Sequence, residues 1–272
     1  MKRIESAANA HFKLVRQLVD SSRERRKSGL TVLDGIHLVQ SYQSGVGTPG
    51  EVWVSETGII NNEIKQILKG ISSSQILLVS NRLFDQLSPV ATPTGIIAVV
   101  KTPQTRPAPA DMDACVLLED IQDPGNLGSI LRTAAAAGVR HVLLSKQSVH
   151  AWSPRVLRAG MGAHFMLEIH EQADLLAIAT AFKGKVVAAS RGASHSLYQC
   201  DLAGKVAVLF GNEGDGLSRE LKAAAHEEVS IPMPGGVESF NVAAAVAVCL
   251  FERVRQLSAI GDCGQSGPFV PM

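Results

Sequence analysis

The chain has 272 residues, of which 46% are hydrophobic and 4% aromatic, and its formal net charge is +1. This length suits one large or two ordinary domains with a core of Ala, Val and Leu, as α/β folds often have. The charged residues are distributed unequally between the two parts of the chain. Residues 1–106 carry 13 Lys and Arg against 8 Asp and Glu, whereas residues 107–272 carry 13 against 17. The first half is therefore basic and the second half acidic.

Composition also excludes several classes of protein. The longest apolar run, Val242–Phe251, is about half the ~20 residues that a membrane span needs. The first three residues, Met-Lys-Arg, lead into no apolar segment of the secretory type. The four cysteines and eight histidines show no metal-ligand spacing, so we predict reduced thiols and no metal site. A cytoplasmic protein without a membrane partner is expected.

The first 30 residues hold eight Lys and Arg and three acids. Leu14, Val15, Leu18 and Val19 have helical spacing, and an RERRK cluster follows just past the predicted helix end. The segment is either a solvated surface or a phosphate-binding one, because several clustered cations suffice for salt-dependent attachment to nucleic acid. The candidate contacts are Lys13, Arg16, Arg23, Arg25, Arg26 and Lys27, with Arg158 from a later helix.

The rest of the basic half alternates between strand and helix patterns. Strands are predicted at 30–33, 52–55, 76–79 and 96–100, and helices at 35–43 and 62–68. This alternation predicts a compact α/β domain over residues 1–106. The proline-rich stretch TPQTRPAPAD, residues 102–111, is the predicted linker.

The second domain, residues 112–272, is predicted to be a parallel sheet covered on both faces. Apolar strands at 115–118, 142–144, 165–169, 186–189 and 206–210 alternate with helices at 127–137, 154–161, 173–182 and 219–225. An Asp-Pro-Gly-Asn turn follows the first strand, and Asn126 is expected to cap the next helix, which carries Arg132. No GxGxxG follows a strand, which disfavours a dinucleotide site.

The stretch 206–250 contains the predicted site. The strand VAVLF runs into the glycine-rich turn GNEGDGLS, which carries Glu213, and the prolines and glycines of IPMPGG form a second irregular loop. Ser239 and Asn241 follow as predicted caps of an apolar helix at 242–251. Taken one at a time, Glu213 could be an ordinary exposed loop acid, and Ser239 and Asn241 could be ordinary helix caps. Two irregular loops beside buried elements are typical of a binding site at the carboxyl edge of a sheet.

Three stretches in order resemble a known family. DPGNLGSILRTAAAAG (123–138), VLFGNEGDGLS (208–218) and IPMPGGVESFNVAAAVA (231–247) are similar to the motifs of the SpoU, or TrmH, RNA ribose 2′-O-methyltransferases of the SPOUT superfamily. The N-terminal part, IESAANAHFKLVRQL to TVLDGIHLV, resembles the ribosomal-protein-like substrate-binding domain of rRNA-modifying members. Together the resemblances cover nearly the whole chain.

The resemblance implies an α/β C-terminal domain with a trefoil knot, a smaller α/β RNA-binding domain, S-adenosylmethionine as methyl donor, and a homodimer with active sites at its interface. The positions that match the family's donor site are Ser190, Leu209, Gly211, Asn212, Ile231, Met233 and Phe240. The positions that match its polar active site are Asn126, Arg132, Glu213, Ser239 and Asn241. Phe240 departs from the commoner leucine, and Asp34 departs from the usual glutamate of the N-terminal domain.

The expected reaction is methyl transfer to a ribose 2′-hydroxyl, which RNA has and DNA lacks. A guanidinium stays protonated, so Arg132 is expected to bind phosphate and stabilise alkoxide charge rather than act as a base. Asn126 would orient the ribose, Ser239 and Asn241 would hold substrate oxygens, and Glu213 would brace the loops. The resemblance favours rRNA over tRNA as the substrate. A tRNA methyltransferase and a non-catalytic RNA-binding protein of the same fold remain alternatives.

Overall fold

The computed structural model describes residues 1–103, 107–235, 237 and 241–261. By compactness the chain divides into two units. The first comprises Met1–Arg106, Leu127–Arg132 and His150–Met166, and the second comprises Pro107–Asn126, Thr133–Val149 and Leu167–Met272. The domain boundaries at 1–106 and 112–272 stay a prediction. Within the described ranges no helix has both the length and the apolar composition to cross a membrane.

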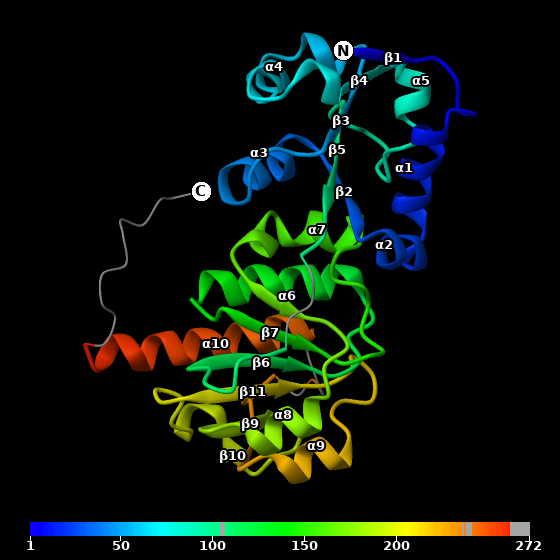
Figure 1. Ribbon diagram of the computed structural model, residues 1–272. Helices are drawn as coiled ribbons and strands as arrows, with labels where there is room; N and C mark the ends of the chain where they lie inside the picture. Colours follow the sequence, from blue (N-terminus) through cyan, green and yellow to red (C-terminus); the bar gives the residue numbers. More distant parts are fainter. Residues whose placement is uncertain (104–106, 236, 238–240, 262–272) are drawn as a thin grey trace. The chain divides into compact units, whose positions relative to one another are not determined.

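The first unit contains a mixed five-stranded sheet in the order β1-β4-β3-β5-β2 (Figure 1). Parallel pairing joins the first three of these strands, β1 (Lys2–Ile4), β4 (Ile76–Val79) and β3 (Glu51–Ser55). Antiparallel pairing joins β5 (Ile96–Lys101) to β3 and to β2 (Leu30–Asp34). Strands β2, β3, β4 and β5 lie close to the predicted positions, because each is a short apolar run bounded by turn residues. Strand β1, with the sequence Lys-Arg-Ile, was not predicted.

This unit contains helices α1 (Ala10–Asp20), α2 (Ser22–Ser28), α3 (Ile36–Gly45), α4 (Asn62–Lys69) and α5 (Asn81–Phe84), together with the later α7 (Pro154–Gly160). Helices α1, α2, α3, α5 and α7 contact strands of the sheet, and α4 contacts α3. Helix α1 buries Phe12, Val15 and Leu18, and the Phe12 ring meets Trp53 edge-on at 6.2 Å between centroids. Of the four residues predicted to form the apolar face, Val15 and Leu18 are buried, and Leu14 and Val19 are partly buried against the same core.

The basic cluster differs from the prediction in two respects. The RERRK residues follow helix α1, as predicted, but they themselves form a second helix, α2, which Ser21 caps by accepting from the Glu24 N–H. Arg25 is buried, and its guanidinium donates to the carbonyls of Leu18 and Val19 and to Nδ1 of His150. Arg25 is therefore corrected from an RNA contact to a structural residue, because its donors are already occupied inside the protein.

The other candidate RNA contacts have exposed side chains. Helix α1 carries two of them, α2 carries three and α7 carries one: Lys13, Arg16, Arg23, Arg26, Lys27 and Arg158. Their contact with RNA stays a prediction.

The second unit contains a seven-stranded, wholly parallel sheet in the order β10-β12-β9-β11-β6-β7-β8. Its strands in chain order are β6 (Ala114–Leu118), β7 (His141–Leu144), β8 (Glu168–His170), β9 (Lys185–Ala189), β10 (His195–Ser196), β11 (Val206–Phe210) and β12 (Glu227–Ser230). The central strands are buried on both faces, which explains why they read as continuous apolar runs rather than as alternating ones.

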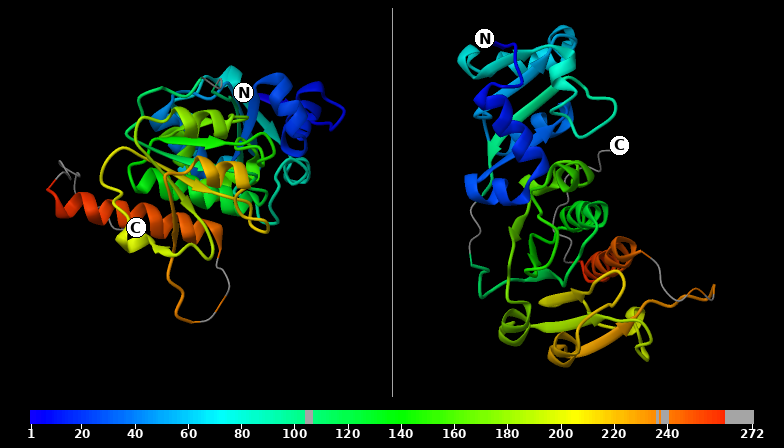
Figure 2. Two further views of the ribbon diagram at one scale, coloured as in Figure 1. Left: turned by 90° about the horizontal axis from the view of Figure 1, so that it is seen from below. Right: turned by 90° about the vertical axis from the view of Figure 1, so that its right-hand side faces the viewer.

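Helices α8 (Leu175–Ala181) and α9 (Arg219–Ala224) cover one face of this sheet, and α10 (Val242–Ala259) lies on the other (Figure 2). Cys115, Leu117, Ala207 and Leu209 belong to the cluster that α8 and α9 complete, and they follow the period of two expected of strands. The fold class is thus α/β with a parallel sheet, as predicted. The trefoil knot stays a prediction.

Three predicted elements of the C-terminal half need correction. The helix after Asp-Pro-Gly-Asn, α6, spans Pro124–Ala136 and begins three residues earlier than expected. Residues 165–169 do not form one strand, because the 3-10 turn Ala163–Phe165 precedes the short β8. The last helix continues to Ala259, so the apolar run at 242–251 is only its first part.

Candidate active site

A cleft of about 620 Å³ lies at the carboxyl edge of three neighbouring strands, β9, β11 and β12. Its walls come from the residues that follow these strands and from the first turns of α6 and α10. The lining is Asn126, Ala189, Ser190, Arg191, Gly192, Phe210, Gly211, Asn212, Glu213, Asp215, Gly216, Leu217, Lys222, Val229, Ser230, Ile231, Met233, Asn241, Val242 and Ala245. Parallel strands place ligand sites at this edge, as the sequence predicted.

Asn126 does not cap helix α6. The cap is Asp123, whose side chain accepts from the Asn126 N–H at 2.7 Å, and Asn126 lies in the first helical turn. The local sequence is compatible with either residue as cap, since Asp and Asn are equally favoured there. Because Asp123 supplies the cap, the side chain of Asn126 bonds to other residues that line the cleft.

A hydrogen-bonded row joins the three motif stretches. The amide of Asn241 donates to Oδ1 of Asn126 at 2.7 Å, and the amide of Asn126 donates to Oε1 of Glu213 at 3.1 Å. Asn241 also caps α10, because its Oδ1 accepts from the N–H groups of Ala243 and Ala244. The row joins the start of α6, the loop after β11 and the start of α10.

The carboxylate of Glu213 is the acceptor at the end of this row. Besides Asn126, it accepts from the backbone N–H groups of Gln122 at 3.3 Å and Asp123 at 3.2 Å. Burial acts to raise the pKa of Glu213, but these hydrogen bonds outweigh it and hold the pKa below its ordinary value. Glu213 is therefore ionised at neutral pH and serves as an anchor for three donors.

The loop after β11 has a backbone that only glycine allows at its first position. A Cβ on Gly211 would lie 2.1 Å from the carbonyl carbon of Gly216 and 2.2 Å from the Leu217 nitrogen. Asn212 closes the loop, because its backbone N–H and carbonyl pair with Gly216 and its side-chain amide donates to the Asp120 carbonyl at 2.8 Å. These hydrogen bonds and the close backbone approach fix the path of the turn.

The structure brings most of the predicted site residues together. Eight of them line the cleft: Asn126, Ser190, Gly211, Asn212, Glu213, Ile231, Met233 and Asn241. Leu209 does not line it, because its side chain is fully buried against α8 and α9. Arg132 is exposed on α6, six residues past Asn126, and is not among the lining residues. Ser239 and Phe240 lie outside the described residues.

Several lining residues were not predicted. Arg191 and Lys222 bring positive charge to the cleft and Asp215 brings negative charge, and the Arg191 guanidinium donates to the Gly214 carbonyl at 2.9 Å. Arg191 follows strand β9 closely and precedes a glycine. Ligand sites lie in loops at the carboxyl ends of parallel strands, which is why the loop after β11 was predicted. The same rule applied to β9 would have predicted Arg191 as well.

The geometry shows a rigid, polar cleft in which the three motifs meet, and comparison with known proteins identifies its family. The profile of the SpoU rRNA methylase family matches residues 113–251, which is 139 of the 272 residues. The chain belongs to the SpoU rRNA methylase family. A second profile, the MRM3-like substrate binding domain, matches residues 9–98 of this SpoU methylase. Both matches agree with the resemblances seen in the sequence.

Two relatives and one solved structure illustrate the similarity. This SpoU methylase is 31% identical over 272 residues to an uncharacterized tRNA/rRNA methyltransferase of Synechocystis, covering 96% of each chain. It is 29% identical over 256 residues to the 23S rRNA (guanosine(2553)-2′-O)-methyltransferase RlmP of Bacillus subtilis, covering 92% of this chain and 98% of RlmP. The AdoMet-bound rRNA methyltransferase of Sinorhizobium meliloti superposes with a TM-score of 0.82 at 25% identity, over 94% of this chain and 98% of that one.

Proposed function

We propose that this SpoU methylase transfers a methyl group from S-adenosylmethionine to a ribose 2′-hydroxyl of rRNA. The observation that carries the proposal is the hydrogen-bonded row from Asn241 through Asn126 to Glu213, because it unites the three family motifs in one cleft. The relative RlmP, named for 2′-O-methylation of 23S rRNA, supports rRNA as the substrate class. The match to a substrate-binding domain over residues 9–98 supports the proposal that the N-terminal part binds RNA.

The cleft suits the methyl donor in size and chemistry. Its volume of about 620 Å³ lies within the range of ordinary cofactor pockets. Phe210, Ile231 and Met233 offer an apolar surface for a flat base, while Arg191 and Asp215 offer opposite charges for the carboxylate and ammonium of the amino-acid end. Ser190, Gly211 and Asn212 would supply polar and backbone contacts. Leu209 would contribute through its backbone.

The donor, once bound, supplies a methyl group already activated by its positive sulfur. The remaining task of the protein is alignment, which can account for a large part of the barrier reduction. Asn126, held by Glu213 and Asn241, would orient the ribose. Glu213 braces the loops and takes no proton, because its carboxylate is engaged by three donors.

Arg132 is proposed to bind the phosphate beside the target ribose and to stabilise negative charge on the attacking oxygen. Its guanidinium remains charged at any working pH, so the proton of the hydroxyl would leave to water or to another acceptor. Arg132 does not line the cleft of its own chain. We therefore propose a homodimer in which Arg132 of one subunit completes the cleft of the other. Ser239 and Phe240 keep their proposed roles as substrate and donor contacts.

The proposed activity is tested by incubating the purified chain with labelled S-adenosylmethionine and unmodified ribosomal RNA, with tRNA as the parallel substrate. Label should enter rRNA at a single ribose 2′-oxygen, which mapping of alkali-resistant bonds locates. Label confined to tRNA would favour the tRNA alternative. Donor binding without transfer to any RNA would favour the non-catalytic alternative. We propose a cytoplasmic location, because the proposed substrate, ribosomal RNA, would be present there.

A further inference from the structure

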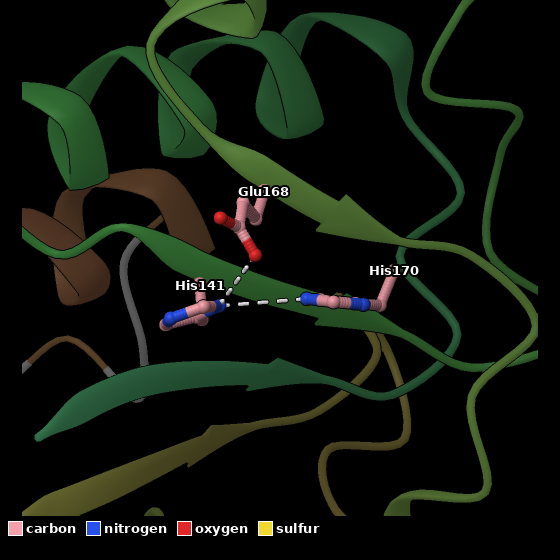
Figure 3. A group of neighbouring side chains, drawn as sticks. All are labelled: His141, Glu168 and His170. Atoms are coloured by element: carbon pink, nitrogen blue, oxygen red, sulfur yellow. Dashed lines mark hydrogen bonds and ion pairs between the residues drawn. The ribbon is translucent and has the colours of Figure 1, made fainter. Parts of the chain in front are cut away.

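Two histidines and one glutamate meet near the edge of the parallel sheet, in a group that the methyl-transfer proposal does not use. His141 begins β7, and Glu168 and His170 begin and end β8. The three side chains point toward one another (Figure 3). Nδ1 of His141 lies 3.6 Å from Oε2 of Glu168 and 3.5 Å from Nε2 of His170. Sequence spacing had indicated no such group, because 27 residues separate His141 from Glu168.

The register of the sheet creates this group. His141 pairs with Glu168 and Leu143 pairs with His170 across the parallel ladder. Glu168 and His170 are two residues apart on one strand, so their side chains leave the same face. Two hydrogen-bonded strands therefore hold all three side chains, which is the rigid support that a preorganised ligand set requires.

The atom spacing matches that of metal ligands. One ligand atom from each residue can be chosen so that all three lie within 4.8 Å of one another. In a tetrahedral zinc site with ligand bonds of about 2.0–2.1 Å, ligand atoms are separated by about 3.3–3.4 Å. The two closest separations here are therefore only slightly wider than in an occupied site. Two imidazoles and one carboxylate are a ligand set that zinc uses in proteins.

We propose that His141, Glu168 and His170 bind a divalent transition-metal ion, with Zn²⁺ as the preferred ion and water as the fourth ligand. Nδ1 of His141, Nε2 of His170 and Oε2 of Glu168 coordinate the ion. Each imidazole then carries its proton on the other ring nitrogen. Glu168 is 40% exposed, so water reaches the group, whereas His170 is buried.

The surroundings of the group orient its carboxylate. Arg140 pairs with the other oxygen of Glu168, Oε1, at 2.9 Å, which leaves Oε2 for the ion. The positive charge of Arg140 opposes cation binding and sets a limit on affinity.

The ion would act on structure rather than on methyl transfer. Strand β8 has three residues and ends the sheet, and the cleft lies beside β9, β11 and β12 at the other side of β6 and β7. A bound ion would join the two last strands, because His141 comes from β7 and the other two ligands come from β8. It should therefore raise the melting temperature of the protein, by an amount that grows with the logarithm of the Zn²⁺ concentration once this exceeds the dissociation constant.

The test uses the full chain freed of metal by a chelator. Zn²⁺ affinity is measured by competition with a chromophoric chelator, and Co²⁺ serves as the spectroscopic probe. His141→Gln and Glu168→Gln should each weaken Zn²⁺ binding at least tenfold. The control is His11→Gln, which removes an exposed histidine whose Nδ1 lies 3.1 Å from a carboxylate oxygen of Glu51 but which belongs to no such group among the residues described. That variant should bind as the unaltered chain does. Mg²⁺, which prefers oxygen ligands, should not compete.

Two results would overturn the proposal. One is equal Zn²⁺ affinity of the unaltered chain and His141→Gln, which would mean that the group is only hydrogen-bonded. The other is a thiolate charge-transfer band in the Co²⁺ complex, which would place the ion on cysteine. If a variant fails to fold, ¹⁵N NMR of the unaltered chain decides instead. Zn²⁺ must shift ring nitrogens of two histidines together, and the absence of that paired shift refutes the site.

Discussion

The side-chain amide of Asn241 donates a hydrogen bond of 2.7 Å to the side-chain oxygen of Asn126. The direction of this bond is set from both ends. Glu213 is an ionised acceptor that requires the amide of Asn126, and the first N–H groups of α10 require the oxygen of Asn241. Reversing either asparagine would place like groups together. The hydrogen bonds of the row therefore run in one direction.

Replacing Asn241 by aspartate should separate capping from alignment. The introduced carboxylate can still accept from the N–H groups of Ala243 and Ala244, so the melting temperature should change by only a few degrees. It cannot donate to Asn126, so methyl transfer should fall by about tenfold or more, the equivalent of one hydrogen bond. Circular dichroism melts and methyl-transfer rates measure the two effects.

Asn61→Asp is the matched control for this substitution. Asn61 caps α4 in the same way, by accepting from the N–H groups of Glu63 and Ile64. This variant should keep both stability and activity. Unchanged transfer by Asn241→Asp would show that the row does not matter for alignment.

Gly211→Ala should destroy donor binding. The new methyl group would lie about 2 Å from the backbone of Gly216, so the loop must move, and over-packing of this kind costs roughly 1–3 kcal/mol. In Gly214→Ala the nearest atom is the Asn212 side-chain oxygen at 3.4 Å, so stability should stay within about 0.5 kcal/mol. Calorimetric titration with S-adenosylmethionine compares the pair. Equal donor affinity of both variants would contradict the assigned donor site.

Arg132→Ala should bind the donor normally but lose turnover, because Arg132 does not line the cleft. Gly211→Ala should lose turnover through the donor site. Co-expression of the two variants should restore part of the activity if Arg132 completes the cleft of a second subunit. One mixed-dimer cleft would then be intact. Activity no higher than the sum of the separate variants would show that Arg132 acts within its own chain.

Arg25 and Arg26 should behave differently although they are neighbours. Arg25→Ala removes two bonds to the carbonyls of Leu18 and Val19 inside the protein, which should lower the free energy of unfolding by about 1–3 kcal/mol. Arg26 is exposed, so Arg26→Ala should leave stability unchanged and weaken RNA binding. The slope of log affinity against log salt should fall by about 1. A slope unchanged by Arg26→Ala would remove α2 from the RNA surface.

Stability should decrease in mild acid because His164 is kept neutral. Burial lowers the pKa of His164 to about 4, although its bond to the Ala151 carbonyl opposes the shift. Below the ordinary pKa of about 6.5 the unfolded chain takes up a proton that the folded chain takes up only near pH 4. The free energy of unfolding should therefore fall between these values, by up to about 3 kcal/mol in all.

Denaturant titrations of His164→Gln across this pH range check the assignment. The variant should be less stable at neutral pH but should show a smaller fall in acid. His37→Gln, at an exposed histidine, should keep the full fall. Equal slopes for His164→Gln and the unaltered chain would assign the acid sensitivity to other groups.

The sequence by itself determined the family and the apolar strands and longer helices, since these depend on short-range patterns. Short or polar elements such as β1, α2 and β12 were not predicted. Buried strands such as β11 are continuous apolar runs in the sequence. The glycine- and proline-rich loops that follow within a few residues carry the motif residues. Even there, local pattern left the cap of α6 open, because both Asp123 and Asn126 are good capping residues. The structure assigned the cap to Asp123.

Only the tertiary structure decided which side chains act together. Asn126 meets Glu213 and Asn241, which lie 87 and 115 residues further along the chain, and Arg25 meets His150 at a separation of 125. The strand register likewise brought His141 to Glu168 and His170. The spacing of apolar residues along a segment indicates whether that segment is a helix or a strand. The hydrogen-bond partners of its polar side chains depend instead on which distant segment packs beside it. Polar groups that folding removes from water need such a partner.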